Sequence, residues 1–242
     1  MTPKDRLCVA LDVDDAVAAL RLAEELKGSA GLFKIGMELF TSAGPSAVSS
    51  AIKMGLKVFL DLKFNDIPNT AAGAARAAAR LGVTMFDVHA SGGSEMVRAA
   101  VEAAGAEATR LGVPRPRVLA VTVLTSISDA ILKKELRVQG PVKDVVRRLA
   151  ELAQAAGADG VIASPKEVST VRSTCGSGFL IVTPGVRPTW ASAAGDQKRV
   201  ASPRDAIALG ADYVVIGRPI LEADDRIAAS GRIVEEIAQA CR

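Results

Sequence analysis

Eight short apolar runs recur along this chain, and they constrain its fold more than any other feature of the sequence. Each run is continuously apolar and does not alternate with polar residues. Such runs are typical of parallel β-strands that are buried on both faces. The predicted strands are Leu7–Leu11, Leu32–Ile35, Val58–Leu60, Met85–Val88, Val118–Val123, Gly160–Ala163, Phe179–Val182 and Tyr213–Ile216.

Longer stretches with helical periodicity separate these runs. In Val142–Ala156 the apolar residues Val145, Leu149 and Leu152 recur at i, i+4 and i+7, and charged residues lie between them. This spacing places a single apolar stripe along one side of a helix. The segment around Ile233 has the same pattern. The sequence therefore predicts buried strands that alternate with amphipathic helices.

Strands that alternate with helices form either a closed barrel or an open doubly wound sheet. Eight units match a barrel, and no glycine-rich dinucleotide motif follows the first strand. The 242 residues of the chain are close to the roughly 250 that are typical of such a barrel. No Pro/Gly/Ser-rich linker divides the chain. We therefore predict an α/β fold in which residues 1–242 form a single-domain (β/α)8 TIM barrel, with its active site at the C-terminal ends of the strands.

Composition and charge exclude several classes of partner. The net charge is only +3 and aromatic residues make up 3% of the chain, whereas nucleic-acid binding requires dense basic or aromatic surfaces. No apolar stretch approaches the roughly 20 residues of a membrane span, and the polar segment Met1–Asp5 is unlike a secretory signal. The cysteine count is odd, with no metal-ligand spacing. We expect a cytoplasmic protein that binds neither a membrane nor a nucleic-acid polymer.

Charged residues gather at the ends of the first three predicted strands. Asp61 and Lys63 are two residues apart and should share a face of the third strand, with Asp66 in the loop that follows. Lys34 lies near the end of the second strand, and Asp12 directly follows the first. Adjacent strand ends meet in a barrel, so we expect these five side chains to form an array of alternating charge. Such an array keeps each lysine protonated and aimed, as a proton donor or as a partner for a developing anion.

Two other interpretations of this array remain open. The charges could form a structural ion-pair network, although buried ion pairs seldom stabilise a fold. They could also bind a metal ion, but lysines lie among the carboxylates, and the only histidine of the chain, His89, belongs to the fourth strand. A lone histidine there is more often a packing residue than a catalyst. We favour a catalytic array and expect no metal.

A second group of residues indicates a phosphate site. Gly217 ends the eighth strand and Arg218 begins the next helix, where free N–H groups and a guanidinium can bind an anion. Arg187, Gln197 and Arg199 lie in the connection after the seventh strand. The loops after strands 7 and 8 are a frequent phosphate site in TIM barrels. We therefore predict that this side of the barrel binds a phosphorylated ligand.

Two connections on the same face of the barrel are unusually long. They are Thr125–Gly140, after the fifth strand, and Pro184–Ser202, after the seventh. Loops of this length without secondary structure are usually lids, binding loops or disordered segments. The helix after the third strand follows its strand closely, and we expect Asn69 or Thr70 to cap it.

Taken together, these motifs resemble one enzyme family. The segment DLKFNDIPNT at Asp61–Thr70 is similar to the signature of orotidine 5′-phosphate decarboxylases. The spacing D-x-K-x-x-D is shared with sugar-phosphate decarboxylases and aldolases of related barrels, but its extension to I-P-N-T is narrower. Further segments agree in order: LDVDD at Leu11–Asp15, FKIGMELF at Phe33–Phe40, FDVHASGG at Phe86–Gly93, VTVLTS at Val121–Ser126, TPGVRP at Thr183–Pro188, GDQKR at Gly195–Arg199 and VIGRP at Val215–Pro219.

The resemblance implies a reaction and a role for each motif. It implies decarboxylation of orotidine 5′-phosphate to uridine 5′-monophosphate in de novo pyrimidine biosynthesis, without a cofactor. Lys63 would protonate C6 of the pyrimidine, beside Asp61 and within an array that includes Lys34 and Asp66. The implied substrate contacts are Asp12 and Lys34 at the ribose, Asp61 at the carboxylate, Thr125 or Ser126 at the pyrimidine, Arg187, Gln197, Gly217 and Arg218 at the phosphate, and Pro184.

The resemblance also implies a homodimer, in which Asp66, Ile67 and Thr70 reach into the site of the neighbouring subunit. Two alternatives stay open. One is a sugar-phosphate decarboxylase or aldolase that uses the same charged residues with a divalent metal. The other is a non-catalytic nucleotide sensor, although a sensor has no need for Lys63 and its array.

Overall fold

The computed structural model describes residues 1–194 and 201–241. Eight parallel strands pair in sequence order and close into a barrel, in which β8 pairs with β1. The expected TIM barrel is confirmed, and the open-sheet alternative is wrong. The strands are β1 (Leu7–Ala10), β2 (Leu32–Gly36), β3 (Val58–Phe64), β4 (Met85–His89), β5 (Arg117–Val121), β6 (Gly160–Ile162), β7 (Leu180–Pro184) and β8 (Tyr213–Ile216).

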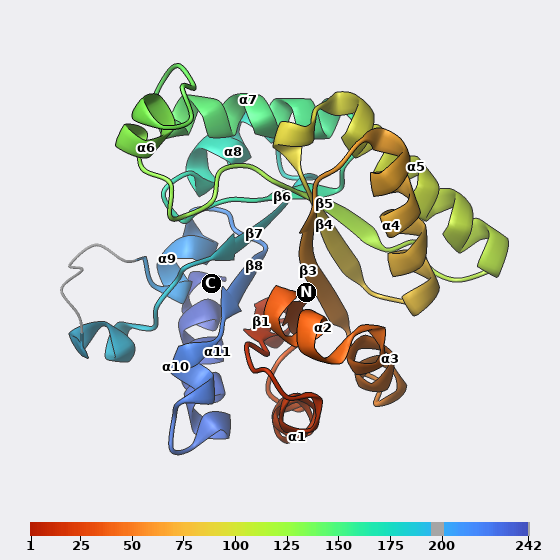
Figure 1. Ribbon diagram of the computed structural model, residues 1–242. Coiled ribbons are helices and arrows are strands. Elements are labelled where there is room, and N and C mark those ends of the chain that lie inside the picture. Colours follow the sequence, from red (N-terminus) through yellow and green to blue (C-terminus); the bar gives the residue numbers. More distant parts are fainter. Residues whose placement is uncertain (195–200, 242) are drawn as a thin grey trace.

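Helices surround the strands on the outside of the barrel (Figure 1). Their apolar stripes pack on the strands, as the periodicity of the sequence predicts. The α-helices are α1 (Ala16–Leu26), α2 (Met37–Ala43), α3 (Pro45–Lys53), α4 (Pro68–Leu81), α5 (Ser94–Leu111), α6 (Asp129–Lys134), α7 (Val142–Ala155), α8 (Val168–Cys175), α9 (Pro203–Ala208), α10 (Arg218–Leu221) and α11 (Arg226–Ala240), and the 3₁₀ helices are η1 (Lys4–Arg6), η2 (Ala90–Gly92) and η3 (Thr189–Ala194).

The barrel has two apolar layers. A large outer cluster lies between strands and helices. A smaller inner cluster fills the barrel itself and includes Cys8, Leu32, Phe59 and Met85. Each of these side chains is almost inaccessible to solvent. The interior is therefore a packed core, and any ligand must bind at its rim.

Two local expectations are wrong. The connection Thr125–Gly140 contains α6, whose N-terminus is capped by the Ser128 hydroxyl, which accepts a hydrogen bond from the Ile131 N–H at 3.3 Å. Helix α4 begins at Pro68, so Asn69 and Thr70 lie inside its first turn and do not cap it. A proline suits the first helical position, because its φ is already helical. It also has no N–H, and an N–H at this position would have no partner within the helix.

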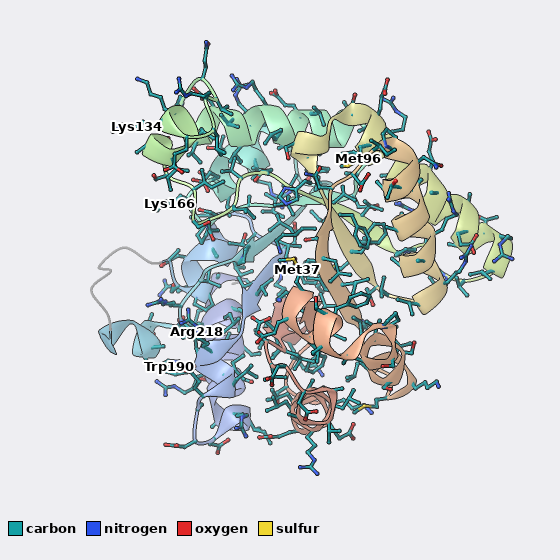
Figure 2. All side chains as sticks on the ribbon, viewed as in Figure 1. Met37, Met96, Lys134, Lys166, Trp190 and Arg218 are labelled. Carbon is teal, nitrogen blue, oxygen red and sulfur yellow. The ribbon has the colours of Figure 1, made fainter. Side chains whose placement is uncertain are left out.

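The connection after β7 is fastened to the outside of the barrel. The Thr189 N–H and hydroxyl both donate to the Glu236 carboxylate on α11, at 3.2 and 3.0 Å. The guanidinium of Arg232 lies 4.5 Å from the centre of the Trp190 ring. Figure 2 labels Trp190 on this segment. Within the part of the chain that the structure describes, no helix has both the length and the apolarity to cross a membrane.

Candidate active site

The carboxyl ends of the first strands place charged groups at one rim of the barrel. Phe59 and Met85 belong to the inner cluster, and side chains two residues apart on a strand share a face. Asp61 and Asp87 therefore continue the inward-facing rows of β3 and β4. Lys34 occupies the corresponding position on β2, where it pairs with Phe59 in register. A layer of charge thus lies directly on the apolar core.

Four of the five expected residues form a connected array. The ammonium nitrogen of Lys34 lies 2.8 Å from Asp12 Oδ1 and 3.4 Å from Asp61 Oδ2. The other oxygen of Asp61 contacts the ammonium of Lys63. The charges alternate in sign along this path, as the sequence predicts. Only 11% of the Lys34 side chain and 13% of the Asp61 side chain are exposed, so solvent screens this central pair weakly.

The array holds Lys34 and Asp61 in their charged forms. Burial opposes ionisation of Lys34, but Asp61 and Asp12 outweigh it and raise the pKa of the ammonium. Burial also opposes ionisation of Asp61, but a hydrogen bond with Asp87 and the charges of Lys34 and Lys63 lower the pKa of this carboxyl. The rim therefore carries fixed charges of both signs at neutral pH.

Gly36 makes room for one of these charges. A Cβ atom at this position would lie 2.7 Å from the ammonium nitrogen of Lys34 and 3.4 Å from Asp12 Oδ1. The residue shares a face with Lys34 at the end of β2, as expected. The lack of a side chain at Gly36 thus permits the Lys34–Asp12 contact.

Strand β3 is irregular near Lys63, whereas the sequence predicts a regular strand. The register with β4 shifts between Leu60 and Phe64. Within this irregular segment Lys63 has φ of 52°, a left-handed conformation that is costly for a residue with a side chain. The Lys63 N–H donates to Asp87 Oδ1 at 2.8 Å. A side chain of β4 therefore supplies the acceptor that a regular ladder would supply from its backbone.

Asp87 is the residue of this rim that the sequence analysis missed. It is completely buried, and burial followed by the neighbouring Asp61 raises its pKa well above the usual range. The available signal was an acidic residue inside the apolar run Met85–Val88. His89, two residues further on, is half-buried; burial and then the charge of Lys63 lower its pKa.

Asp66 does not join the array within one chain. It lies beyond the end of β3 and is exposed, and its Oδ1 accepts a hydrogen bond from the Ile67 N–H at 2.7 Å. Ile67 is itself 67% exposed, and Thr70 is exposed on the first turn of α4. The expectation that one chain assembles all five charges is therefore wrong.

A large open cavity of about 1430 Å³ adjoins the array on the side of β7 and β8. The connections after β5 and β7 contribute to its wall, as expected for binding loops. Ser126 is exposed but is not among the wall residues, although Thr125 is. The sequence-predicted residues that line the cavity are Asp12, Lys34, Thr125, Pro184, Arg187, Gly217 and Arg218.

Three of the predicted phosphate residues, Arg187, Gly217 and Arg218, line this cavity. Arg218 begins α10 directly after Gly217, whose backbone lies close to β1: a Cβ atom there would be 3.4 Å from that of Ala10. The backbone of Arg187, shortly after β7, is bonded to the segment that precedes α9, because its N–H donates to the Ala201 carbonyl at 3.1 Å. Lys166, which the sequence analysis missed, also lines the cavity, and Figure 2 labels it and Arg218 on the same side of the barrel.

Gln197 and Arg199, which were predicted to bind the phosphate, lie outside the described residues. Within residues 1–194 and 201–241, no group of three or more His, Cys, Asp or Glu side chains is arranged to hold a metal ion.

Comparisons with known proteins agree with the motifs. A model of the "Orotidine 5'-phosphate decarboxylase / HUMPS family" matches residues 5–233. The chain is 52% identical to an orotidine 5′-phosphate decarboxylase of Moorella thermoacetica, over 98% of this chain and 94% of the relative. It is 51% identical to the Heliobacterium modesticaldum protein of the same name, over 99% and 98%. A crystal structure of orotidine 5′-phosphate decarboxylase from Lactobacillus acidophilus superposes with a TM-score of 0.85 at 40% identity, covering 96% of this chain and 98% of that one.

Proposed function

Since the chain belongs to the orotidine 5′-phosphate decarboxylase / HUMPS family, we propose that it is a carboxy-lyase that converts orotidine 5′-phosphate to uridine 5′-monophosphate and carbon dioxide, a step of pyrimidine biosynthesis. The observation that carries this proposal is the path of alternating charge from Asp12 through Lys34 and Asp61 to Lys63, at the edge of a cavity that Arg187 and Arg218 line.

The spacing of these groups supports one orientation of the nucleotide. Its phosphate binds near Arg187, Gly217 and Arg218, which line the cavity. Gln197, to which the resemblance also assigns a phosphate contact, lies outside the described residues. Asp12 and Lys34, which also line the cavity, hold the ribose hydroxyls.

The pyrimidine then lies over the array. Thr125, on the cavity wall, or Ser126 beside it contacts the ring, and Pro184 contributes a further substrate contact from the end of β7. The carboxylate at C6 lies between Asp61 and Lys63.

The chemical step depends on Lys63 and its neighbours. When the bond from C6 to the carboxylate breaks, its electron pair stays in the ring plane, where no carbonyl is positioned to delocalise it. The ammonium of Lys63 stabilises this charge and donates a proton to C6, and the lysine then regains a proton from water. Asp61 repels the departing carboxylate. Because the array is already oriented, stabilisation by Lys63 requires little reorganisation in the transition state. We favour it as a larger effect than the repulsion of the carboxylate by Asp61. No cofactor is required in this scheme.

The phosphate supports the reaction from a distance. Its binding energy can hold the pyrimidine against the array and close the β7 connection over it, which excludes water. The anchorage of Thr189 and Trp190 on α11 restricts where that connection can move.

The exposed residues after β3 complete the site in a homodimer. Asp66, Ile67 and Thr70 from one subunit reach the site of the other. In support of this proposal, all three are exposed, and Ile67 presents a large apolar side chain to solvent. Asp66 would then add its negative charge next to Lys63 across the subunit boundary.

The decisive experiment follows the ultraviolet absorbance of orotidine 5′-phosphate on addition of purified protein, with a chelator present. Lys63→Ala serves as the paired variant. We expect rapid conversion to uridine 5′-monophosphate by the wild-type protein, and almost none by Lys63→Ala. The variant should still bind uridine 5′-monophosphate, because the phosphate and ribose residues are unchanged.

Each other outcome selects a different function. Nucleotide binding without turnover by the wild-type protein would indicate a sensor. Turnover of a pentulose or hexulose phosphate with added magnesium, but not of orotidine 5′-phosphate, would indicate a sugar-phosphate enzyme. Full turnover by Lys63→Ala would show that the proton comes from another group.

A further inference from the structure

Asp87 is a buried carboxyl group for which the proposed chemistry has no role. It does not line the cavity and has no solvent exposure. Its Oδ1 accepts the Lys63 N–H, whereas its Oδ2 is buried and receives no hydrogen bond from any donor in the part of the chain that the structure describes. Leaving a buried carboxylate oxygen without a donor is costly. The arrangement therefore needs an explanation.

The group that faces Asp87 is another carboxyl, that of Asp61. Leu60 pairs with Phe86 in register, so Asp61 and Asp87 are the residues that directly follow this pair on the two strands, where the register begins to shift. Two ionised carboxylates at such close range repel each other strongly, and a proton held between them removes the repulsion. That proton also gives Asp87 a hydrogen-bond donor for Asp61.

The surroundings decide which of the two carboxyls keeps the proton. Asp61 contacts the ammonium groups of both Lys34 and Lys63, which favour its ionised form. Asp87 contacts no ammonium group among the described residues, and its partner in register on β5 is the apolar Leu119. The other charge acting on it is that of Lys63, and the nearest titratable group on its own strand, His89, has a lowered pKa. The proton therefore belongs to Asp87.

The same side chain also supports an unfavourable backbone conformation. Lys63 has φ of 52°, a left-handed conformation that is unfavourable for a residue with a Cβ atom. Such conformations persist where the surrounding structure holds them. The Lys63 N–H donates to the buried Asp87 carboxyl, which thereby helps to hold this conformation. Asp87 thus accepts a hydrogen bond from the backbone of the proton donor and faces the carboxylate that orients the ammonium of that donor.

We propose that Asp87 is a positioning residue of the decarboxylase site, which acts as a neutral acid: its hydroxyl donates to Asp61 while its carbonyl oxygen accepts the Lys63 N–H. This inference rests on the proposed function. Asp87 does not touch the substrate. It fixes the distance and orientation between Asp61 and Lys63, and it keeps the rim from carrying a second buried negative charge beside Asp61.

Two substitutions separate a neutral acid from a carboxylate. In Asp87→Asn, the amide NH₂ can donate to Asp61 and the amide oxygen can accept the Lys63 N–H, so both contacts of the neutral acid are retained. In Asp87→Ala both contacts are lost. We expect kcat of Asp87→Asn to stay within about 3-fold of wild type, and kcat of Asp87→Ala to fall about 10²-fold, as expected for a displaced catalytic group. KM should change little in either variant, because the cavity residues are intact.

A measurement that does not depend on turnover accompanies the kinetics. Carbon-13 NMR of protein labelled at the aspartate carboxyl groups should show one signal at a protonated shift at neutral pH. That signal should be missing in Asp87→Asn. If Asp87→Ala does not fold, Asp87→Asn and this signal decide the question without it.

The outcomes of this experiment distinguish the two proposals. An active wild type with an inactive Asp87→Asn, or with an ionised Asp87 in the NMR spectrum, would overturn the inference and leave the proposed function intact. Full activity in folded Asp87→Ala would also overturn it. A wild-type protein that does not decarboxylate orotidine 5′-phosphate would refute the proposed function, and with it the role of Asp87 in that reaction.

Discussion

At the scale of single residues, the site depends on where one glycine leaves space. An alanine at position 36 would place its Cβ atom 2.7 Å from the Lys34 ammonium, which must then move away from Asp12 and Asp61. Only the end of a flexible side chain has to shift, so the barrel should stay folded. We expect Gly36→Ala to lower kcat/KM by about 10²-fold through misplacement of the array, with the melting temperature almost unchanged.

Gly28→Ala is the matched control, because a Cβ atom there meets nothing within 4 Å. The absorbance assay and thermal unfolding of both variants check this prediction. Equal activity of the two variants would show that the position of the Lys34 ammonium does not limit catalysis.

Arg218 allows an independent test of the phosphate end. It lines the cavity at the start of α10, and its guanidinium can make charge-assisted hydrogen bonds to a phosphate. We expect Arg218→Ala to lower kcat/KM by about 10²-fold or more, on the basis of roughly 1.5–3 kcal/mol per such bond. The protein should remain folded. The control is Arg204→Ala, an exposed arginine of α9 that does not line the cavity; if both variants keep wild-type kinetics, the phosphate is bound elsewhere.

At the scale of elements, helices α4 and α5 are joined by a small ion cluster remote from the cavity. The buried Glu107 carboxylate on α5 accepts hydrogen bonds from Arg80 on α4 at 2.6 Å and from Arg110 at 2.7 Å. Arg110 and then Arg80 lower the pKa of Glu107 to about 2. Because the folded pKa lies below the ordinary value of 4.5, the cluster stabilises the fold fully above that value and loses its effect as the pH falls toward about 2.

We therefore expect Glu107→Gln to lower the free energy of unfolding at pH 7, and the difference from wild type to shrink as the pH falls through this window. Urea denaturation at several pH values measures this. Glu151→Gln is the control, since Glu151 pairs with Arg147 at 2.9 Å on an exposed face of α7 and should contribute little. A pH-independent loss in Glu107→Gln would mean that packing, not charge, explains the effect.

At the scale of the whole molecule, the proposed dimer predicts that inactive variants can complement each other. Lys63→Ala and Asp66→Ala should each be nearly inactive alone. In a mixed dimer, one of the two sites combines an intact Lys63 from one chain with an intact Asp66 from the other. With random pairing of equal amounts after co-expression, this restores about one quarter of wild-type activity per total protein, since each site of a symmetric dimer draws on both chains.

The control for complementation combines Lys63→Ala with Lys34→Ala. The Lys34–Asp61–Lys63 contacts form within one chain, so no mixed dimer of this pair contains an intact site. Activity is expected only for the first mixture. Absence of activity in both mixtures, with dimers present by sedimentation, would place Asp66 outside the partner's site.

The sequence by itself determined the architecture and the main members of the site. The eight continuous apolar runs and the apolar stripes of the helices between them are local patterns. Each pattern shows which side chains of its own segment are buried. The positions of the strands were accordingly predicted closely, with Tyr213–Ile216 matching β8 in full and β3 extending beyond Leu60 to Phe64. Lys34, Asp61 and Lys63 were also identified correctly as neighbours, because consecutive barrel strands bring their carboxyl ends together.

Only the tertiary structure decided how these charges are held. The irregular register of β3 against β4, the left-handed backbone of Lys63 and the pairing of Asp61 with Asp87 all depend on how two separate strands align. Local periodicity contains no information on that alignment. The exclusion of Asp66 from the array of its own chain has the same origin. A residue's neighbours along the chain determine whether it is buried, whereas its chemical partners are set by strands far away in sequence.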